Sequence, residues 1–291
     1  MTKAVRFIAI TLVCLPLYCH AGGELPLSTT FKGQSKFDSI VRKAVAEQWS
    51  QLPIGQRMVK IAKELEGVPY QSYTLEIHDH VESPSINFEG MDCWTFFEAC
   101  LCLGRMLESP KKRYQAEDLL REIEWTRYRN GKCQGNYLDR IHYLAEWYVD
   151  NEKRGNIIDL TRSFPNTRME NRCQEMSLLW KSYRYLKHNP QLRTQMAKQE
   201  VRLNRMPVYM IPKHKVSAIE SQMQDGDIIG IARTNDGSYC SHVGIIIKDS
   251  KGQSRFMHAS TTHKKIIVDS TISGYLNGHD KHAGILLARP K

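Results

Sequence analysis

The hydrophobic pattern of this chain changes near Arg202, and that change limits the folds open to it. Before this point, apolar residues recur with the period of amphipathic helices. After it, short β runs alternate with turns of roughly two to five residues. Helices in one part of a chain and strands in another are typical of α+β domains. We therefore predict N-terminal helices packed on an antiparallel β-sheet or small barrel.

The pattern also predicts where the elements lie. Helices are expected at 37–48, at 54–65, from Cys93 onward, and at 116–128, 138–149 and 173–187. A strand and loop are expected at 155–164, and the strands of the sheet at 208–211, 228–232, 242–247, 255–260, 266–268 and 284–288. Asn189 and Pro190 are expected to end the last helix.

The N-terminus has the composition of a signal peptide. Lys3 and Arg6 precede an apolar run at 7–18, and small residues suit cleavage after Ala21. We expect 1–21 to be removed and the remainder, 22–291, to be a single domain, secreted and periplasmic in a two-membrane bacterium. The apolar run is too short for a comfortable membrane span, and no lipoprotein signal surrounds its cysteines. The sequence thus predicts no stable membrane anchor.

Charge and cysteine content exclude several classes of protein. The formal net charge is +10, but the basic residues are scattered and no nucleic-acid motif is present, so we expect acidic wall polymers rather than nucleic acid. Of the eight cysteines, those outside 1–21 are too sparse for a disulfide scaffold. Cys133 and Cys173 could form a bridge. No zinc-type spacing occurs, and we expect neither a metal nor a cofactor.

Cys93 is the first candidate for chemistry. Asp92 is a good N-cap residue, and an apolar run follows it, so Cys93 is expected in the first turn of a mostly buried helix. The positive end of the helix dipole would lower the pKa of its thiol into a range of roughly 3.5–7.5. A thiolate there would be a nucleophile. The alternative is that Cys93 is one more buried apolar residue.

Two histidines could complete a cysteine hydrolase. His242 opens one expected strand and His258 lies in the next, so antiparallel pairing could bring the side chains together. A single histidine of this kind more often has a structural role or simply lies at the surface. A cysteine at a helix start, a histidine that can act as base and a second that can orient it form one coherent site.

The residues around these three positions resemble a known superfamily. In order, the chain resembles the NlpC-type papain-like cysteine peptidases of bacteria at Gly67-Val68-Pro69-Tyr70, Asp92-Cys93, Gly226-Asp227-Ile228-Ile229, His242-Val243-Gly244-Ile245 and His258-Ala259. From about Phe37 onward it is more similar still to the N-acetylmuramoyl-L-alanine amidase-like family, at Thr74-Leu75-Glu76, Asn87-Phe88, Asp92 to Glu98, Arg127 to Gly131, and Arg140-Ile141-His142-Tyr143 with Trp147.

The resemblance implies roles for five of these residues. Cys93 is the nucleophile, His242 the general base and acid, and His258 the residue that orients His242. Tyr70 is implied near the nucleophile or the oxyanion. Asn87 is a weaker oxyanion candidate, with the backbone N–H of Cys93 as the other donor.

The chain departs from shorter members of the superfamily after the Cys93 helix. About 130 residues separate Cys93 from Asp227, and we expect a helical insertion at about 108–205 before a β meander at 206–291. The insertion is expected to form substrate walls. Arg140 and His142 are the candidates, on the same expected helix as Trp147, since arginine pairs well with the carboxylates of muropeptides. The alternative is that Arg140 is a solvated helix residue.

These features together predict a monomeric cysteine amidase acting on peptidoglycan fragments, at the amide between N-acetylmuramic acid and L-alanine. One alternative is an endopeptidase of the same fold that cuts between D-glutamate and the diamino acid. Another is a binding module for muropeptides without catalysis, and a third is a toxin that uses the same chemistry against neighbouring cells.

Overall fold

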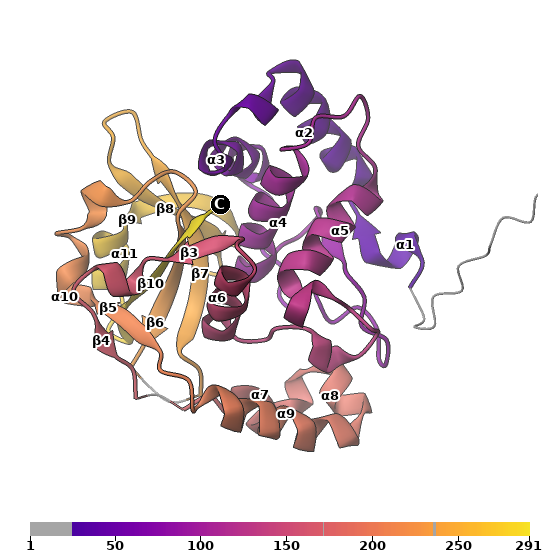
Figure 1. The fold of residues 1–291 in the computed structure, drawn as a ribbon, viewed down its shortest axis with the longest axis vertical. Coiled ribbons are helices and arrows are strands. Elements are labelled where there is room, and N and C mark those ends of the chain that lie inside the picture. Colours follow the sequence, from indigo (N-terminus) through magenta and orange to yellow (C-terminus); the bar gives the residue numbers. More distant parts are fainter. Residues whose placement is uncertain (1–24, 171, 235–236) are drawn as a thin grey trace, which may run out of the picture.

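The computed structural model describes residues 25–170, 172–234 and 237–291, and its architecture is α+β as expected. The expected signal peptide at 1–21 lies outside the described residues. Helices occupy one side of the molecule and a twisted sheet the other (Figure 1). Among the described residues, no helix combines the length and the apolar character needed to cross a membrane.

The sheet is antiparallel throughout its described pairings. Its order is β4-β5-β10-β6-β7-β8-β9, and β3 also pairs with β10. Strands β6 to β9 form the expected meander, whereas β10 returns to lie between β5 and β6. The strand bounds are β3 Ile157–Asp159, β4 Thr167–Arg168, β5 Tyr209–Pro212, β6 Ile228–Arg233, β7 Cys240–Lys248, β8 Ser254–Ser260, β9 Lys265–Thr271 and β10 His282–Pro290.

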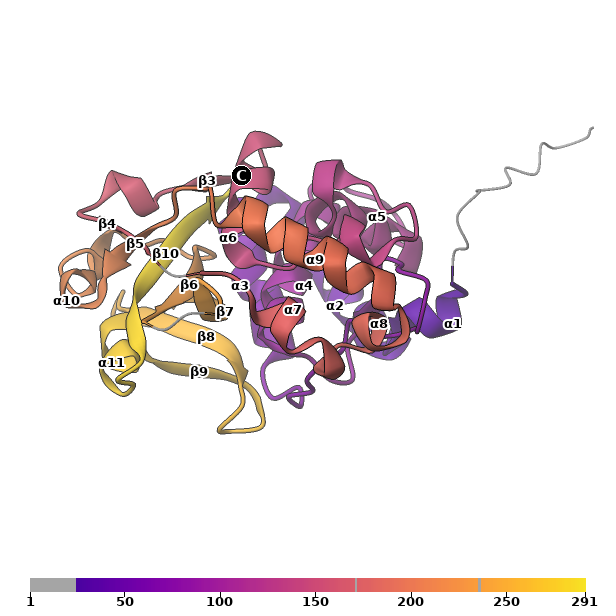
Figure 2. The same ribbon diagram turned by 90° about the horizontal axis from the view of Figure 1, so that it is seen from below.

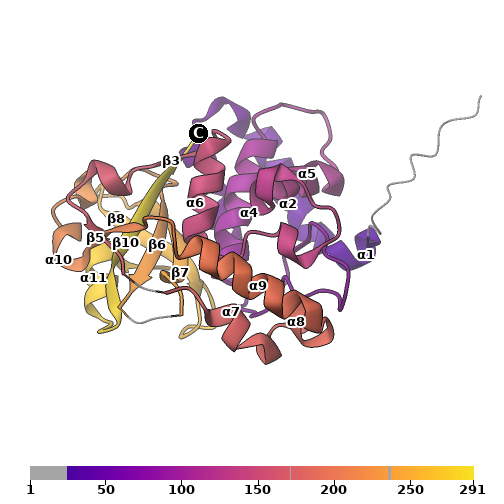
Figure 3. The ribbon, with the colours of Figure 1, turned by 60° about the horizontal axis from the view of Figure 1, so that its bottom comes forward.

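The helices fall before and after the start of the insertion. Those before the insertion are α1 Leu27–Thr30, α2 Gln34–Ala46, α3 Ile54–Leu65 and α4 Cys93–Met106, with a small parallel pair, β1 Phe31–Lys32 and β2 Ile86–Asn87. The later ones are α5 Ala116–Arg127, α6 Leu144–Lys153, α7 Glu175–Leu178, α8 Arg184–His188, α9 Pro190–Leu203, α10 Lys213–Val216 and α11 Ile272–Asn277. Helices α7, α8 and α9 lie together at the lower edge of the helical side in Figure 1, and they come to the front when that edge is turned forward (Figures 2 and 3).

Helix α4 is the centre of the helical side. Its residues from Thr95 to Gly104 are all buried, and the helix packs against α3, α5 and β7. Gly104 allows α3 to approach, since a Cβ there would lie 3.3 Å from Met58 Cγ. Side chains of β7, the strand next to α4, point alternately to the two faces of the sheet. Ile245 and Ile247 belong to the core shared with the helices, and Ile246 belongs to a second core on the far face. This packing places the start of α4 against the histidine-bearing strands.

Three expectations about the insertion are wrong. The helix expected at 138–149 begins only at Leu144, because Asn136 caps a single 3₁₀ turn at Tyr137–Asp139 and the chain is then extended at Arg140. The segment at 173–187 is broken into short helices, although the last of them, α8, ends with Asn189 as its C-cap, as expected. Pro190 also begins α9, which was not expected, because proline suits a first helical position. Cys133 and Cys173 are both free thiols rather than a disulfide.

Candidate active site

Cys93 is the first residue of α4, as the sequence predicts. Asp92 is the N-cap, and its Oδ1 accepts a hydrogen bond from Thr95 N at 2.8 Å. In return, Thr95 Oγ1 accepts one from Asp92 N at 3.0 Å. This capping box fixes the entry of the chain into the helix. It therefore fixes where the Cys93 thiol lies relative to the sheet.

The two histidines meet across neighbouring strands. His242 lies on β7 and His258 on β8, which pair antiparallel. His242 Nε2 lies 2.7 Å from His258 Nδ1, and the rings are perpendicular with centroids 4.8 Å apart. His258 is only 2% exposed and stacks on Phe256. The spatial proximity of His242 and His258 that the strand pattern predicts is thus confirmed.

A carboxylate that the sequence did not indicate continues this chain of contacts. Asp269, on β9, places its Oδ2 3.3 Å from His258 Nε2. A carboxylate accepts the Nε2–H of His258, which leaves Nδ1 of that ring with a lone pair toward His242. His242 then donates Nε2–H to His258, and its Nδ1 is the nitrogen that can accept a proton. The order of contacts is His242, His258 and Asp269.

Cys93 and His242 line the same cavity. Its volume is about 460 Å³, and it lies between the start of α4, the strands and the insertion. Many of its lining residues belong to the insertion, including Arg140, His142 and Tyr183. The expectation that the insertion supplies walls of a cavity at Cys93 agrees with this placement.

Three of the four expected binding residues line this cavity. Tyr70 lies beside Cys93, held through its backbone N–H, which donates to Lys264 O at 2.8 Å. His142 is half-buried in the wall, with Nε2 3.0 Å from Tyr137 O. Asn87 is not brought to Cys93: it lines a separate cavity of about 310 Å³ elsewhere, and its Nδ2 donates to Gln71 Oε1 at 3.3 Å. We therefore assign the oxyanion no donor from Asn87.

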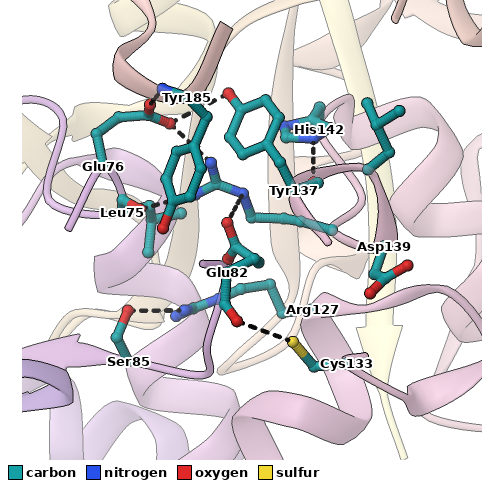
Figure 4. Close-up of polar contacts among 12 residues, drawn as sticks. Leu75, Glu76, Glu82, Ser85, Arg127, Cys133, Tyr137, Asp139, His142 and Tyr185 are labelled. Carbon is teal, nitrogen blue, oxygen red and sulfur yellow. Dashed lines mark hydrogen bonds and ion pairs between the residues drawn. The ribbon is translucent and has the colours of Figure 1, made fainter. Parts of the chain in front are cut away.

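Arg140 lies in the wall, but buried carboxylates surround it. Its Nη2 pairs with Glu76 Oε1 at 2.7 Å, and its Nε lies 3.7 Å from Glu82 Oε2. Figure 4 labels these two carboxylates. Arg140 is 3% exposed, so it is not a solvated residue. It also precedes α6, so it does not share a helix with Trp147. Its charge is partnered within the protein, so its most direct effect is to hold Glu76 in the cavity wall.

The charged cluster extends further into the core. Arg127 Nε donates to Glu98 Oε2 at 2.9 Å, and Tyr128 Oη donates to Glu82 Oε1 at 2.7 Å. Burial raises the pKa of Glu82 to about 7, although Arg140 and Tyr128 oppose that change. Two guanidinium groups here face three carboxyl groups, so a proton on Glu82 makes the cluster neutral.

The protonation states of Cys93 and His242 differ from the expectation of a low thiol pKa. Burial raises the pKa of the Cys93 thiol to about 12, and the Asp92 charge raises it further. Hydrogen bonds from the backbone of Val243 on β7, and from Trp94 and Cys93 at the helix start, lower it by less. Burial also lowers the pKa of His242 well below its usual range, aided by His258 and His282. Desolvation at both positions therefore favours a neutral thiol and a neutral imidazole in the resting pair.

Alkylation of Cys93 should reveal this neutral pair. Because the thiolate fraction grows as pH rises toward the raised pKa, labelling by iodoacetamide should be slow at about pH 7 and increase about tenfold per pH unit up to about pH 10. Mass spectrometry of the Cys93 peptide measures the rate. A fast rate that is unchanged between about pH 6 and pH 9 would instead indicate a stable thiolate–imidazolium pair.

Solved structures with the same architecture are known. An N-acetylmuramoyl-L-alanine amidase from Bacteroides uniformis is 30% identical, with 82% of this chain and 99% of that chain covered and a TM-score of 0.73. A putative xylanase from Bacteroides fragilis is 30% identical, with 78% of this chain and 98% of that chain covered and a TM-score of 0.69. A protein from Legionella pneumophila shares the fold. It is 20% identical, with 88% of this chain and 95% of that chain covered and a TM-score of 0.64. No curated protein matches this chain.

A family model described as AmiA-like, N-acetylmuramoyl-L-alanine amidase-like, matches residues 60–285. The match includes Cys93, His242, His258 and Asp269, together with the insertion between the first two. This range covers most of the chain, and it is the family that the sequence motifs resemble. The chain therefore belongs to the AmiA-like family of N-acetylmuramoyl-L-alanine amidase-like proteins.

Proposed function

We propose that this protein is a cysteine amidase of the NlpC-type papain-like group, which hydrolyses the amide between N-acetylmuramic acid and L-alanine in peptidoglycan fragments. Family membership supports the hydrolase class and the peptidoglycan substrate. The observation that carries the proposal is that Cys93, at a helix start, and His242, which contacts His258, line one cavity.

The reaction begins with proton transfer. Because His242 Nε2 is engaged by His258, Nδ1 is the nitrogen that accepts the thiol proton. The Cys93 sulfur then attacks the lactyl carbonyl carbon, forming a C–S bond and an oxyanion. His242 returns the proton to the L-alanine nitrogen as the C–N bond breaks. Water next attacks the thioester with His242 as base, which releases the sugar acid and regenerates the thiol.

The oxyanion has two candidate donors near Cys93. One is the backbone N–H of Cys93, which is among the first N–H groups of α4 and needs no partner within the helix. The other is the Tyr70 hydroxyl. Burial raises the pKa of Tyr70 to about 12, with the charge of Asp92 raising it further, so the hydroxyl keeps its proton at neutral pH. Each donor would be worth roughly a hundred- to thousandfold in rate.

The cavity walls suit a sugar. Tyr70, Trp94 and Tyr183 line the space beside Cys93, and aromatic faces with a few polar groups are the usual walls of small-molecule sites. Glu76, held by Arg140, supplies an acceptor for hydroxyl or amide hydrogens. We place the muramic sugar there.

Digestion of purified muropeptides tests the proposal. Mass spectrometry should find free sugar and intact stem peptide, and EDTA should leave the rate unchanged. A sugar that still bears a dipeptide would keep the thiol mechanism but identify the endopeptidase alternative. Binding without any cleavage would identify the binding module. Export of the chain through a signal peptide at 1–21, which is then removed, to the periplasm of a two-membrane bacterium is part of the same proposal.

Asp269 is proposed to position the histidines, and Asp269→Asn tests this role. An asparagine amide would donate to His258 Nε2, which turns both histidines to the tautomers that leave His242 Nδ1 protonated. We expect kcat to fall by roughly ten- to a hundredfold with KM little changed, and the acid limb of the pH profile to move. Asp249→Asn, which removes a surface carboxylate paired with Arg255, is the control and should keep both constants. Equal losses in the two variants would exclude the positioning role.

A further inference from the structure

A second cavity adjoins the active site on the side of His242. It has a volume of about 490 Å³ and is lined by Arg233, Ser241, Gly278, His279, Asp280, Lys281 and His282. Arg233 and Ser241 also line the cavity that holds Cys93, and Ser241 precedes His242 in the chain. The two cavities are therefore neighbours with a shared wall.

Aromatic contacts connect this cavity to the catalytic histidine. The Tyr275 ring is stacked with the His242 ring, at 6.3 Å between centroids, and with the His282 ring, at 5.4 Å. Its centroid lies 5.1 Å from that of the His279 ring. Tyr275 thus stands between the His242 ring and the second cavity. A substrate that extends past His242 on this side would reach the histidines beyond Tyr275.

The cavity is basic. Arg233 and Lys281 contribute positive charges to its lining, and Lys213 donates from Nζ to His279 O at 3.0 Å at its edge. The acidic groups nearby are Asp280, which also lines the cavity, and Glu175, which pairs with Arg233 at 3.2 Å. Burial, with the charges of His279 and Lys213, lowers the pKa of His282 to about 4, in keeping with a positive local potential. His282 Nδ1 is buried without a hydrogen-bond partner among the described residues.

The position of the general acid determines which part of the substrate lies toward this cavity. The general acid must lie on the side of the leaving nitrogen, so the leaving peptide extends past His242 and the acyl sugar lies on the other side. In a stem peptide, the residue after L-alanine is D-glutamate, whose α-carboxylate is free. The sugar joined through its lactyl amide has no such charge.

We propose that this second cavity, at Arg233, Ser241, His279, Lys281 and His282, binds the α-carboxylate of D-glutamate in the leaving stem peptide. The inference rests on the proposed amidase function and adds a specificity site to it. Lys281 supplies charge from the rim, and Ser241 and the histidines supply hydrogen-bond donors. The site favours substrates in which this carboxylate is free over those in which it is amidated.

Two matched substrates test the inference. N-acetylmuramoyl-L-alanyl-D-glutamate and N-acetylmuramoyl-L-alanyl-D-isoglutamine differ only in that one α-carboxylate is a carboxamide. We expect kcat/KM to be about three- to tenfold higher for the glutamate form. Lys281→Met should reduce this preference to about twofold or less, whereas Lys251→Met, at an exposed turn elsewhere on the sheet, should retain it. No preference in the unaltered protein, or an unchanged preference in Lys281→Met, would overturn the inference.

A binding measurement separates this inference from the amidase proposal. Calorimetry of the Cys93→Ala protein with L-alanyl-D-glutamate and L-alanyl-D-isoglutamine requires no turnover. Tighter binding of the glutamate peptide, lost in Cys93→Ala with Lys281→Met, supports the site even if no muropeptide is cleaved. Equal binding of the two peptides, or binding of neither, contradicts it even if muropeptide cleavage is normal.

Discussion

Replacing Cys93 with alanine should abolish hydrolysis of muropeptides, with kcat reduced by about four orders of magnitude or more. The nucleophile forms the bond that carries the acyl group, and no other side chain can substitute for it. The change removes one sulfur from a half-buried position beside a cavity, so the fold should persist. Product formation by mass spectrometry, together with the thermal unfolding midpoint, measures the two effects separately.

Cys240 provides the matched control for that variant. It is also a half-buried free thiol that lines the same cavity, on the strand that bears His242, but it has no place in the proposed relay. Cys240→Ala should therefore keep most of the activity. Loss of activity in Cys240→Ala with retention in Cys93→Ala would mean that the nucleophile has been assigned to the wrong thiol.

Replacing Arg127 with methionine should cost about 3–5 kcal/mol in the free energy of unfolding. Arg127 and Glu98 pair with side chains that are 1% and 0% exposed. Removing the guanidinium leaves the Glu98 carboxylate buried without its countercharge, and that desolvation penalty dominates. Urea unfolding followed by circular dichroism gives the change.

A second arginine on the helical side shows whether burial causes that loss. Arg105 pairs with Glu122 at 2.9 Å, but their side chains are 20% and 28% exposed. Arg105→Met should cost only about 0–1 kcal/mol. Adding Glu98→Gln to Arg127→Met should recover part of the loss, because the uncompensated charge is then gone. Equal losses for Arg105→Met and Arg127→Met would contradict the argument from desolvation.

The parts of the site that depend on local rules could be predicted from the sequence. Asp92 before an apolar run signals a helix start, which places Cys93 at the first turn of α4. The runs that contain His242 and His258 follow each other with a turn between them, so antiparallel pairing brings them together. Each of these inferences concerns neighbours along the chain or adjacent strands.

The remaining features depend on contacts that no local pattern encodes. Asp269 reaches His258 only because β8 and β9 have one particular register, with a bulge between them. The partners of Arg140 are Glu76 and Glu82, more than fifty residues earlier in the chain, so its burial could not be inferred from its own segment. The raised thiol pKa follows from packing around Cys93, which a helix dipole argument omits.

The position of β10 inside the sheet affects when the sheet can be completed during synthesis of the chain. Cys93 emerges from the ribosome about 190 residues before residue 282, roughly 10–40 s earlier at bacterial rates of synthesis. Until β10 is made, β5 and β6 lack the strand that joins them. The sheet that holds His242 and His258 is incomplete for that interval. The thiol is therefore synthesised long before the strands that carry His242, His258 and Asp269, and before the strand that joins β5 to β6.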